Sequence, residues 1–272
     1  MPGLVQRCAL PLAALCLAGL LAGCAGGAGN GSGTAELLTS SDMTAGQKRA
    51  EIRRELAIGY YQQGQLEVAL DEIKKALQAD PDSAESYGVR ALIYSDMNQL
   101  PLAQDNYQRA LKLAPNNADL NNNYGAFLCH HGREKEALPY FDLALKNPAT
   151  DASKGNVLNN AGSCRVNLKD YAGAEPYLLQ ALQLTPDLLE TNFNLARVYY
   201  GRGDYQRAGS FMTRLSKIAK MESLTADVLW LGIKVQHKLG DTGAEAGLAT
   251  QLRRRHAGSA EYAAYQRGAF DE

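Results

Sequence analysis

Apolar residues recur along this chain three and four positions apart, the spacing that places them on one face of a helix. Two copies of the pattern, each followed by a proline, are Ala69-x3-Ile73-x2-Ala76-x4-Pro81 and Ala103-x3-Tyr107-x2-Ala110-x4-Pro115. An earlier apolar segment precedes each copy, as Leu56-Ala57-x2-Tyr60 and as Tyr87-x3-Ala91-x2-Tyr94. The pattern therefore predicts pairs of amphipathic helices that return every 34 residues, as from Ala69 to Ala103.

The repeat continues through most of the remaining chain. Three further copies are marked by Ala137, Phe141 and Ala144, by Ala174, Leu178 and Ala181, and by Ala208, Met212 and Leu215. A short insertion around 150–154 separates the third copy from the fourth, and a degenerate sixth copy includes Leu231-Gly232. A helix pair with this period is typical of tetratricopeptide repeats. The predicted fold is all-α, a tetratricopeptide-repeat superhelix with five clear repeats and a degenerate sixth.

Glycines and prolines stand where such repeats need turns. Glycine adopts the left-handed conformation that ends a first helix, and proline ends a second helix because inside one it would cost ~3 kcal/mol. The positions are Gly64, Gly132 and Gly203 for the turns, and Pro81, Pro115 and Pro186 for the helix ends. Neighbouring repeats must stack to bury their apolar faces. We assign residues 46–220 to repeats one to five, and 221–272 to the sixth repeat and a solvated C-terminal cap.

The beginning of the chain has the pattern of an export signal. Arg7 precedes an apolar run from Cys8 to Leu21, which is shorter than the ~20 residues of a membrane-spanning helix. The run ends in Leu21-Ala22-Gly23-Cys24 and resembles the lipobox of bacterial lipoproteins, in which the cysteine is acylated and becomes the new amino terminus. The sequence predicts a signal peptide at 1–23 and a lipidated Cys24 followed by a glycine-rich tether, together 24–45.

The residue after Cys24 bears on the destination of such a lipoprotein. An aspartate at this place is the inner-membrane retention signal in enteric-type bacteria, and here the residue is Ala25. The expected location is therefore the periplasmic face of the outer membrane, with membrane attachment through the lipid.

Charge and motifs exclude several classes of function. The 28 basic and 29 acidic residues nearly balance, so no electrostatic case for nucleic-acid binding exists. His130 and His131 are adjacent and so do not share the helix face that a metal site would need. The sequence also has no glycine-rich phosphate loop or nucleophile elbow. We expect no enzyme, no cofactor, no bound metal and no small-molecule substrate.

Cys129 and Cys164 are the two cysteines left once the signal peptide and the lipidation site are set aside. They fall on the first helices of neighbouring repeats, and an oxidising compartment favours a disulfide between them. Two buried free thiols are the alternative. A catalytic thiol is excluded because the adjacent His130 points about 100° away, and a thiol oxidoreductase would favour Cys-x-x-Cys.

The chain resembles the type IV pilus biogenesis and stability lipoproteins, the pilotins of the pilus secretin, from about Gln47 to Tyr262. The resemblance rests on Asn122-Asn123-Tyr124-Gly125-x-Phe127-Leu128-Cys129, Asn159-Asn160-Ala161-Gly162-x-Cys164, Leu231-Gly232-Ile233 and Gly258-Ser259-x-Glu261-Tyr262. It implies binding to secretin subunits, which the protein helps to reach the outer membrane and to multimerise. The alternative is a scaffold lipoprotein of another envelope assembly machine.

A partner is expected in the groove lined by the first helices of the repeats. Counting along these helices gives its predicted residues as Ile58, Tyr61, Leu92, Asn122, Asn159, Arg197 and Tyr200. Apolar positions at one end and polar ones at the other suit an extended or helical peptide. Asn123, Asn160 and Asn194 recur at one repeat position, where they either form hydrogen bonds between repeats or contact the ligand.

The lipobox makes a direct prediction about anchoring. Cys24→Ser removes the expected acylation site, so this variant should appear as a soluble periplasmic protein while the unmodified chain fractionates with outer membranes. Membrane fractionation followed by immunoblotting measures the distribution. A Cys24→Ser protein that still sediments with the outer membrane would contradict the predicted anchor.

Overall fold

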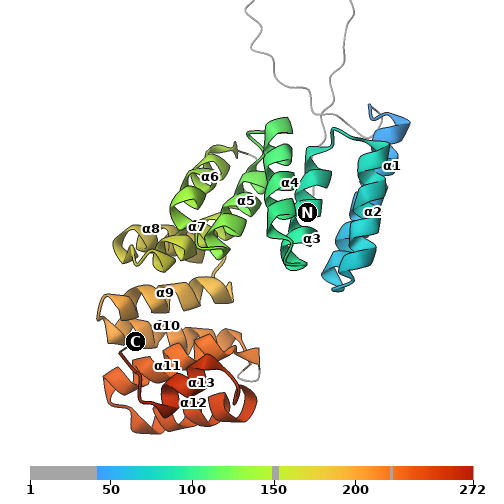
Figure 1. Ribbon diagram of the computed structural model, residues 1–272. Coiled ribbons are helices and arrows are strands. Elements are labelled where there is room, and N and C mark those ends of the chain that lie inside the picture. The colour runs from blue at the N-terminus through green and yellow to red at the C-terminus, as the bar shows by residue number, and fades with distance from the viewer. Residues whose placement is uncertain (1–41, 149–152, 221–222, 272) are drawn as a thin grey trace, which may run out of the picture. The chain divides into compact units, whose positions relative to one another are not determined.

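The computed structural model describes residues 42–148, 153–220 and 223–271, and these residues form thirteen α-helices and no β-strand (Figure 1). The helices are α1 (Ala45–Gln62), α2 (Leu66–Ala79), α3 (Ala84–Asp96), α4 (Leu100–Leu113), α5 (Ala118–His130), α6 (Glu134–Lys146), α7 (Lys154–Asn167), α8 (Tyr171–Leu184), α9 (Leu189–Gly201), α10 (Tyr205–Ile218), α11 (Ala226–Leu239), α12 (Thr242–Arg255) and α13 (Ala260–Gln266). Among them, none is both long and apolar enough to cross a bilayer. The predicted signal peptide, Cys24 and most of the tether lie outside the described residues.

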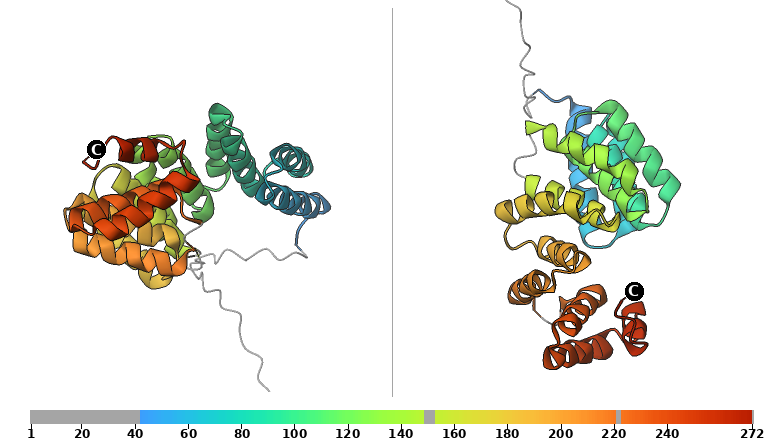
Figure 2. Two further views of the ribbon diagram at one scale, coloured as in Figure 1. Left: turned by 90° about the horizontal axis from the view of Figure 1, so that it is seen from below. Right: turned by 90° about the vertical axis from the view of Figure 1, so that its left-hand side faces the viewer.

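The helices pack as consecutive pairs, α1 with α2 through α11 with α12, and each pair contacts the next (Figure 2). Odd-numbered helices also contact one another from α1 to α13, and α13 rests against both α11 and α12. This arrangement confirms the predicted all-α tetratricopeptide-repeat fold. We call the surface formed by the odd-numbered helices the A-helix face.

Small residues allow the two helices of a repeat to approach closely. The alanines of the repeat pattern are fully buried, as at Ala69, Ala103 and Ala137. Gly162 makes the same point, since a Cβ atom there would lie 2.5 Å from Cγ of Leu178 on α8. Large core residues such as Phe141 fill the space beside these contacts.

The turns inside the repeats use the left-handed conformation. Gly64, Gly132 and Gly203 have φ angles of 74°, 73° and 77°. In the second and fourth repeats the same turn is made by Asn98 and Lys169, with φ angles of 57° and 59°. Asparagine tolerates this conformation through local hydrogen bonding, whereas for lysine it costs roughly 1–2 kcal/mol.

A disulfide joins Cys129 near the end of α5 to Cys164 of α7, with the Cα atoms 5.7 Å apart. Both cysteines are buried. The bond therefore links the first helices of the third and fourth repeats, on either side of α6.

Replacing both Cys129 and Cys164 with alanine should lower the free energy of unfolding by about 3–4 kcal/mol. The bond closes a loop across a sequence separation of 35 residues. Without it the unfolded chain has more conformational entropy, which favours unfolding. Urea unfolding of both proteins measures the difference. In a nonreduced digest of protein isolated from its own envelope, two freely alkylated thiols would contradict the linkage.

Candidate partner-binding pocket

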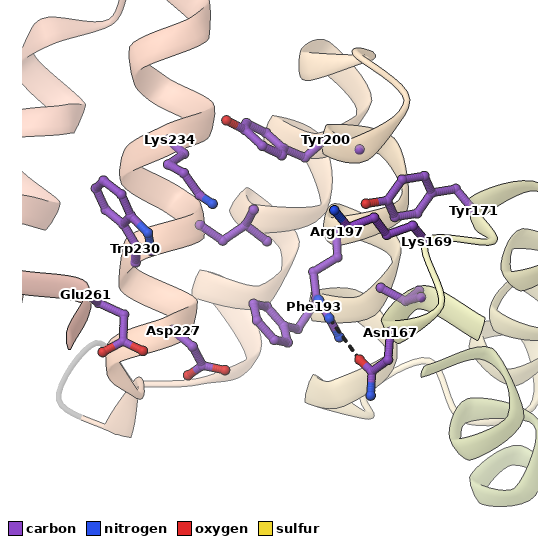
Figure 3. Close-up of a pocket in the computed structure, with 13 residues that line it drawn as sticks. Asn167, Lys169, Tyr171, Phe193, Arg197, Tyr200, Asp227, Trp230, Lys234 and Glu261 are labelled. Carbon is purple, nitrogen blue, oxygen red and sulfur yellow. Dashed lines mark hydrogen bonds between the residues drawn. The ribbon is translucent and has the colours of Figure 1, made fainter. Parts of the chain in front are cut away.

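A pocket of about 720 Å³ lies on the A-helix face toward the carboxyl end of the array (Figure 3). Its walls come from α9 and α11, with contributions from the end of α7, the turn that follows it, the start of α8 and α13. The lining residues are Val166, Asn167, Lys169, Tyr171, Phe193, Arg197, Tyr200, Gly201, Asp227, Trp230, Leu231, Lys234 and Glu261. Aromatic and charged side chains thus share one cavity, a composition that suits a peptide better than a purely apolar ligand.

Arg197 of α9 is held across the centre of the pocket. Its guanidinium donates to Oδ1 of Asn194 at 3.2 Å and to Oδ1 of Asn167 at 3.0 Å, and it lies over the ring of Phe193 at 5.9 Å. Burial lowers the pKa of Arg197 from its usual value, and the Asp227 carboxylate partly opposes the shift. These contacts fix the direction of the guanidinium while leaving its charge inside the cavity.

Lys234 of α11 extends into the pocket from the facing wall (Figure 3). Its Nζ lies 5.3 Å from the ring centroid of Tyr200 and 5.5 Å from that of Trp230. Burial lowers the pKa of Lys234, and the positive charge of Arg197 lowers it further. The positive charges of Arg197 and Lys234, which come from different helices, therefore both lie in this pocket.

The aromatic wall around Lys234 is supported by the end of the chain. Phe270 packs against Trp230 with ring centroids 5.6 Å apart and stacks on His237 at 3.8 Å. The Tyr200 hydroxyl donates to the Phe270 carbonyl at 3.1 Å. Asp271 pairs with Lys238 of α11. Residues after α13 thus hold the Tyr200 and Trp230 rings in place.

Two carboxylates mark the other end of the pocket. Asp227, in the first turn of α11, and Glu261, in the first turn of α13, lie near each other, on the side of Trp230 away from the Lys234 ammonium (Figure 3). The pocket therefore holds cationic and anionic side chains together, with the Phe193 and Trp230 rings beside them.

The seven groove residues predicted from the sequence lie in different environments in the structure. Arg197 and Tyr200 both line the pocket. Asn159 is only 7% exposed, because its Oδ1 accepts from Thr191 at 3.1 Å and from Asn194 at 3.2 Å. The prediction that Asn159 faces a partner is therefore wrong, since this side chain serves the contact between repeats.

The other asparagines of the sequence pattern also connect repeats. Asn122 is half-buried, and its Oδ1 accepts from Asn160 of the next repeat at 3.0 Å. Together with the bond from Asn194 to Asn159, this contact forms an asparagine ladder that runs from α5 to α9. Two roles were considered for Asn160 and Asn194. Their observed contacts are hydrogen bonds between repeats.

Ile58, Tyr61 and Leu92 lie at the other end of the array and are all half-buried. Tyr61 packs against the core of the first repeat, and burial together with its hydrogen bond to Asp96 raises its pKa to about 12. Leu92 packs against the core that contains the disulfide. None of the three lines the pocket that contains Arg197 and Tyr200.

Sequence reasoning missed Phe193, Trp230, Lys234 and Lys169. The sequence contained a signal for Trp230. Gly232 of the sixth repeat follows the equivalent Ala196 of the fifth by 36 residues, and Trp230 follows Asn194 by the same distance. Trp230 therefore occupies the asparagine position of the sixth repeat. Lys169 had no such signal, since its place depends on the left-handed turn after α7.

His130 and His131 belong to no group of possible metal ligands among the residues that the structure describes. His130 and His131 are exposed, and His131 packs against Phe127 with ring centroids 4.8 Å apart. Within residues 42–148, 153–220 and 223–271, no group of three histidine, cysteine, aspartate or glutamate side chains is arranged to hold an ion.

Comparisons with known proteins agree with the fold and extend it. Residues 89–152 and 167–225 each match a model of the tetratricopeptide repeat. The type IV pilus assembly protein PilF of Pseudomonas aeruginosa is 29% identical over 212 residues, which cover 78% of this chain and 82% of PilF. The crystal structure of PilW, described as a widely conserved type IV pilus biogenesis factor, is 30% identical with a TM-score of 0.72, over 80% of this chain and 98% of PilW.

A solved structure of Pseudomonas aeruginosa PilF gives a similar result. It is 27% identical with a TM-score of 0.73, over 83% of this chain and the whole of that one. Fold and pocket define the class as a tetratricopeptide-repeat protein with a charged pocket on its A-helix face. The chain belongs to the family of tetratricopeptide-repeat proteins that includes PilW and PilF.

Leu92→Ala should lower the free energy of unfolding by about 1–2 kcal/mol, because a half-buried leucine loses part of the ~3 kcal/mol that full burial provides. Leu184→Ala on α8 is the matched control, since Leu184 is 53% exposed. Thermal unfolding followed by circular dichroism compares the two variants. Unchanged stability in Leu92→Ala together with weakened partner binding would show that Leu92 belongs to the partner-binding groove, as the sequence predicts.

Proposed function

We propose that this protein is an outer-membrane lipoprotein that binds secretin subunits of the type IV pilus and promotes their localisation and multimerisation in that membrane. The family supports this assignment, because its members PilF and PilW are described as pilus assembly and biogenesis proteins. The observation that carries it is the pocket between α9 and α11, on the face where such a repeat protein can receive another chain.

The composition of the pocket supports binding of a protein segment. Phe193 and Tyr200 offer large, partly buried rings, and the largely buried ring of Trp230 lines the pocket beside them. Aromatic side chains contribute most of the affinity at many protein interfaces. Arg197 and Lys234 add groups that can select the partner and fix its orientation. We propose a binding role and no catalytic one for these residues.

The proposed lipid anchor gives the binding site its place in the cell. Acylation at Cys24 would attach the chain to the outer membrane, and the residues from Ala25 to about Ala45 would separate the lipid from α1. A secretin subunit bound at the pocket would then be held beside the membrane in which it assembles. Holding several subunits close to one surface raises their effective concentration and favours multimerisation.

The proposal is tested by identifying the partner in the native envelope. Affinity purification of the tagged protein after chemical cross-linking should recover pilus secretin subunits. Phe193→Ala should reduce this recovery at least tenfold, because it removes an anchor from the pocket floor. Leu179→Ala, an exposed apolar residue on α8, should leave recovery unchanged.

Folding must be checked in the same variants, since Phe193 also packs against neighbouring core residues. A Phe193→Ala protein that melts within a few degrees of the unmodified chain makes its loss of binding attributable to the pocket. Recovery of components from a different envelope machine, with no secretin, would overturn the proposed function.

A further inference from the structure

The segment that follows α13 folds back onto the A-helix face. Gly268 takes a left-handed φ angle of 67°, and its N–H donates to the Tyr265 carbonyl at 3.0 Å, so the chain reverses direction there. We call residues 268–271 the tail. The residues that the tail contacts on α9 and α11 are Tyr200, Trp230, His237 and Lys238.

The aromatic residue of the tail is bound by both helices. The Phe270 ring stacks on the His237 ring, with centroids 3.8 Å apart and planes inclined by 3°, and it lies 5.6 Å from the Trp230 ring. The Phe270 carbonyl accepts a hydrogen bond from the Tyr200 hydroxyl at 3.1 Å. Side-chain contacts from α11 and a backbone contact from α9 thus form one site for an aromatic residue.

Asp271 adds a carboxylate to the bound unit. It pairs with Lys238, and this contact lowers the pKa of Asp271 and raises the pKa of Lys238. The Asp271 side chain is 85% exposed, and an exposed ion pair of this kind contributes little to stability. The site therefore matches an aromatic residue followed by a carboxylate, and the ion pair at its edge is easily exchanged.

The residues that hold the tail lie between two cavities along α9 and α11. Tyr200 and Trp230 also line the pocket described above, where Figure 3 shows their rings on facing helices. A second cavity of about 490 Å³ is lined by residues 202–206 and by Lys238 and Leu239. A partner segment that filled both cavities would therefore meet the tail between them.

We infer that the tail is an intramolecular ligand of the A-helix face, which a partner polypeptide displaces by placing its own aromatic residue and carboxylate on Trp230, His237 and Lys238. The inference rests on the proposed function only in placing the partner on this face. The chemistry of the displacing segment follows from the unit that the site holds, an aromatic side chain followed by a carboxylate.

Competition with the tail would make binding selective. A segment tethered within the same chain has an effective concentration on the order of millimolar, so a short peptide with the same two groups competes poorly. A longer segment that also fills the two adjoining cavities gains contacts that the tail does not make. The tail thus excludes weak ligands and yields to a partner of matching sequence.

The test compares the full chain with a variant that lacks residues 269–272. Random twelve-residue peptide libraries selected on the truncated variant should enrich an aromatic residue followed by Asp or Glu. Synthetic copies should bind the truncated variant at least tenfold more tightly than the full chain, because no tail competes. Trp230 is the single tryptophan of the chain and contacts Phe270, so its emission measures binding.

Point variants locate the contact and guard against a folding defect. Phe270→Ala keeps the chain at full length, removes the competing ring and should bind the selected peptides at least fivefold more tightly than the unmodified chain. Lys238→Gln in the truncated variant should weaken binding about threefold. Lys217→Gln, which removes an exposed lysine on α10, is the matched control and should leave binding unchanged.

In the envelope, the truncated variant should recover at least threefold more cross-linked partner than the full chain. Unchanged or reduced recovery would overturn the inference, whereas recovery of a partner other than secretin would overturn only the proposed function. Equal peptide binding to both chains, or selected peptides without the aromatic and acidic pair, would also overturn the inference. So would unfolding of both the truncated and the Phe270→Ala proteins, or tails exchanged between two copies, which light scattering would detect as dimers.

Discussion

Close approach of the two helices within each repeat is the constraint on which the rest of the structure depends. Buried alanines recur along the contact, and at Gly162 the neighbouring leucine leaves no room for a Cβ atom. Because this distance is short and repeated, each pair takes nearly the same shape and stacks on the next. The odd-numbered helices are then brought together on one face, which is how residues from α7, α9 and α11 come to line one pocket.

The pocket lies where the regular pattern of the array stops. From α5 to α9, asparagines join successive first helices by hydrogen bonds, at Asn160 to Asn122 and at Asn194 to Asn159. At α11 the corresponding position holds Trp230 in place of an asparagine. The α9 and α11 helices are joined instead through aromatic and charged side chains. A departure from the repeat therefore produces both the cavity and its distinctive chemistry.

Sequence reasoning predicted the features that depend on local pattern and on the repeat period. The helix pairs, the left-handed turn at Gly132 and the spacing of Cys129 and Cys164 follow from local pattern and repeat period. The direction in which Asn159 points could not be obtained in this way, because it depends on the tilt between neighbouring first helices. The convergence of Lys169, Arg197 and Lys234 likewise depends on packing across three repeats, so counting along single helices found only Arg197.

The disulfide between α5 and α7 provides a covalent path for mechanical force that bypasses α6. Tension between the amino-terminal end and a partner held at α9 and α11 would pass from Cys129 to Cys164 through the sulfur atoms, and α6 would carry none of it. The 35-residue separation that the bond spans would otherwise release roughly 120 Å of extended chain, at ~3.5 Å per residue. While the bond is intact, the segment between the two cysteines cannot extend under force, so the middle of the array keeps its length.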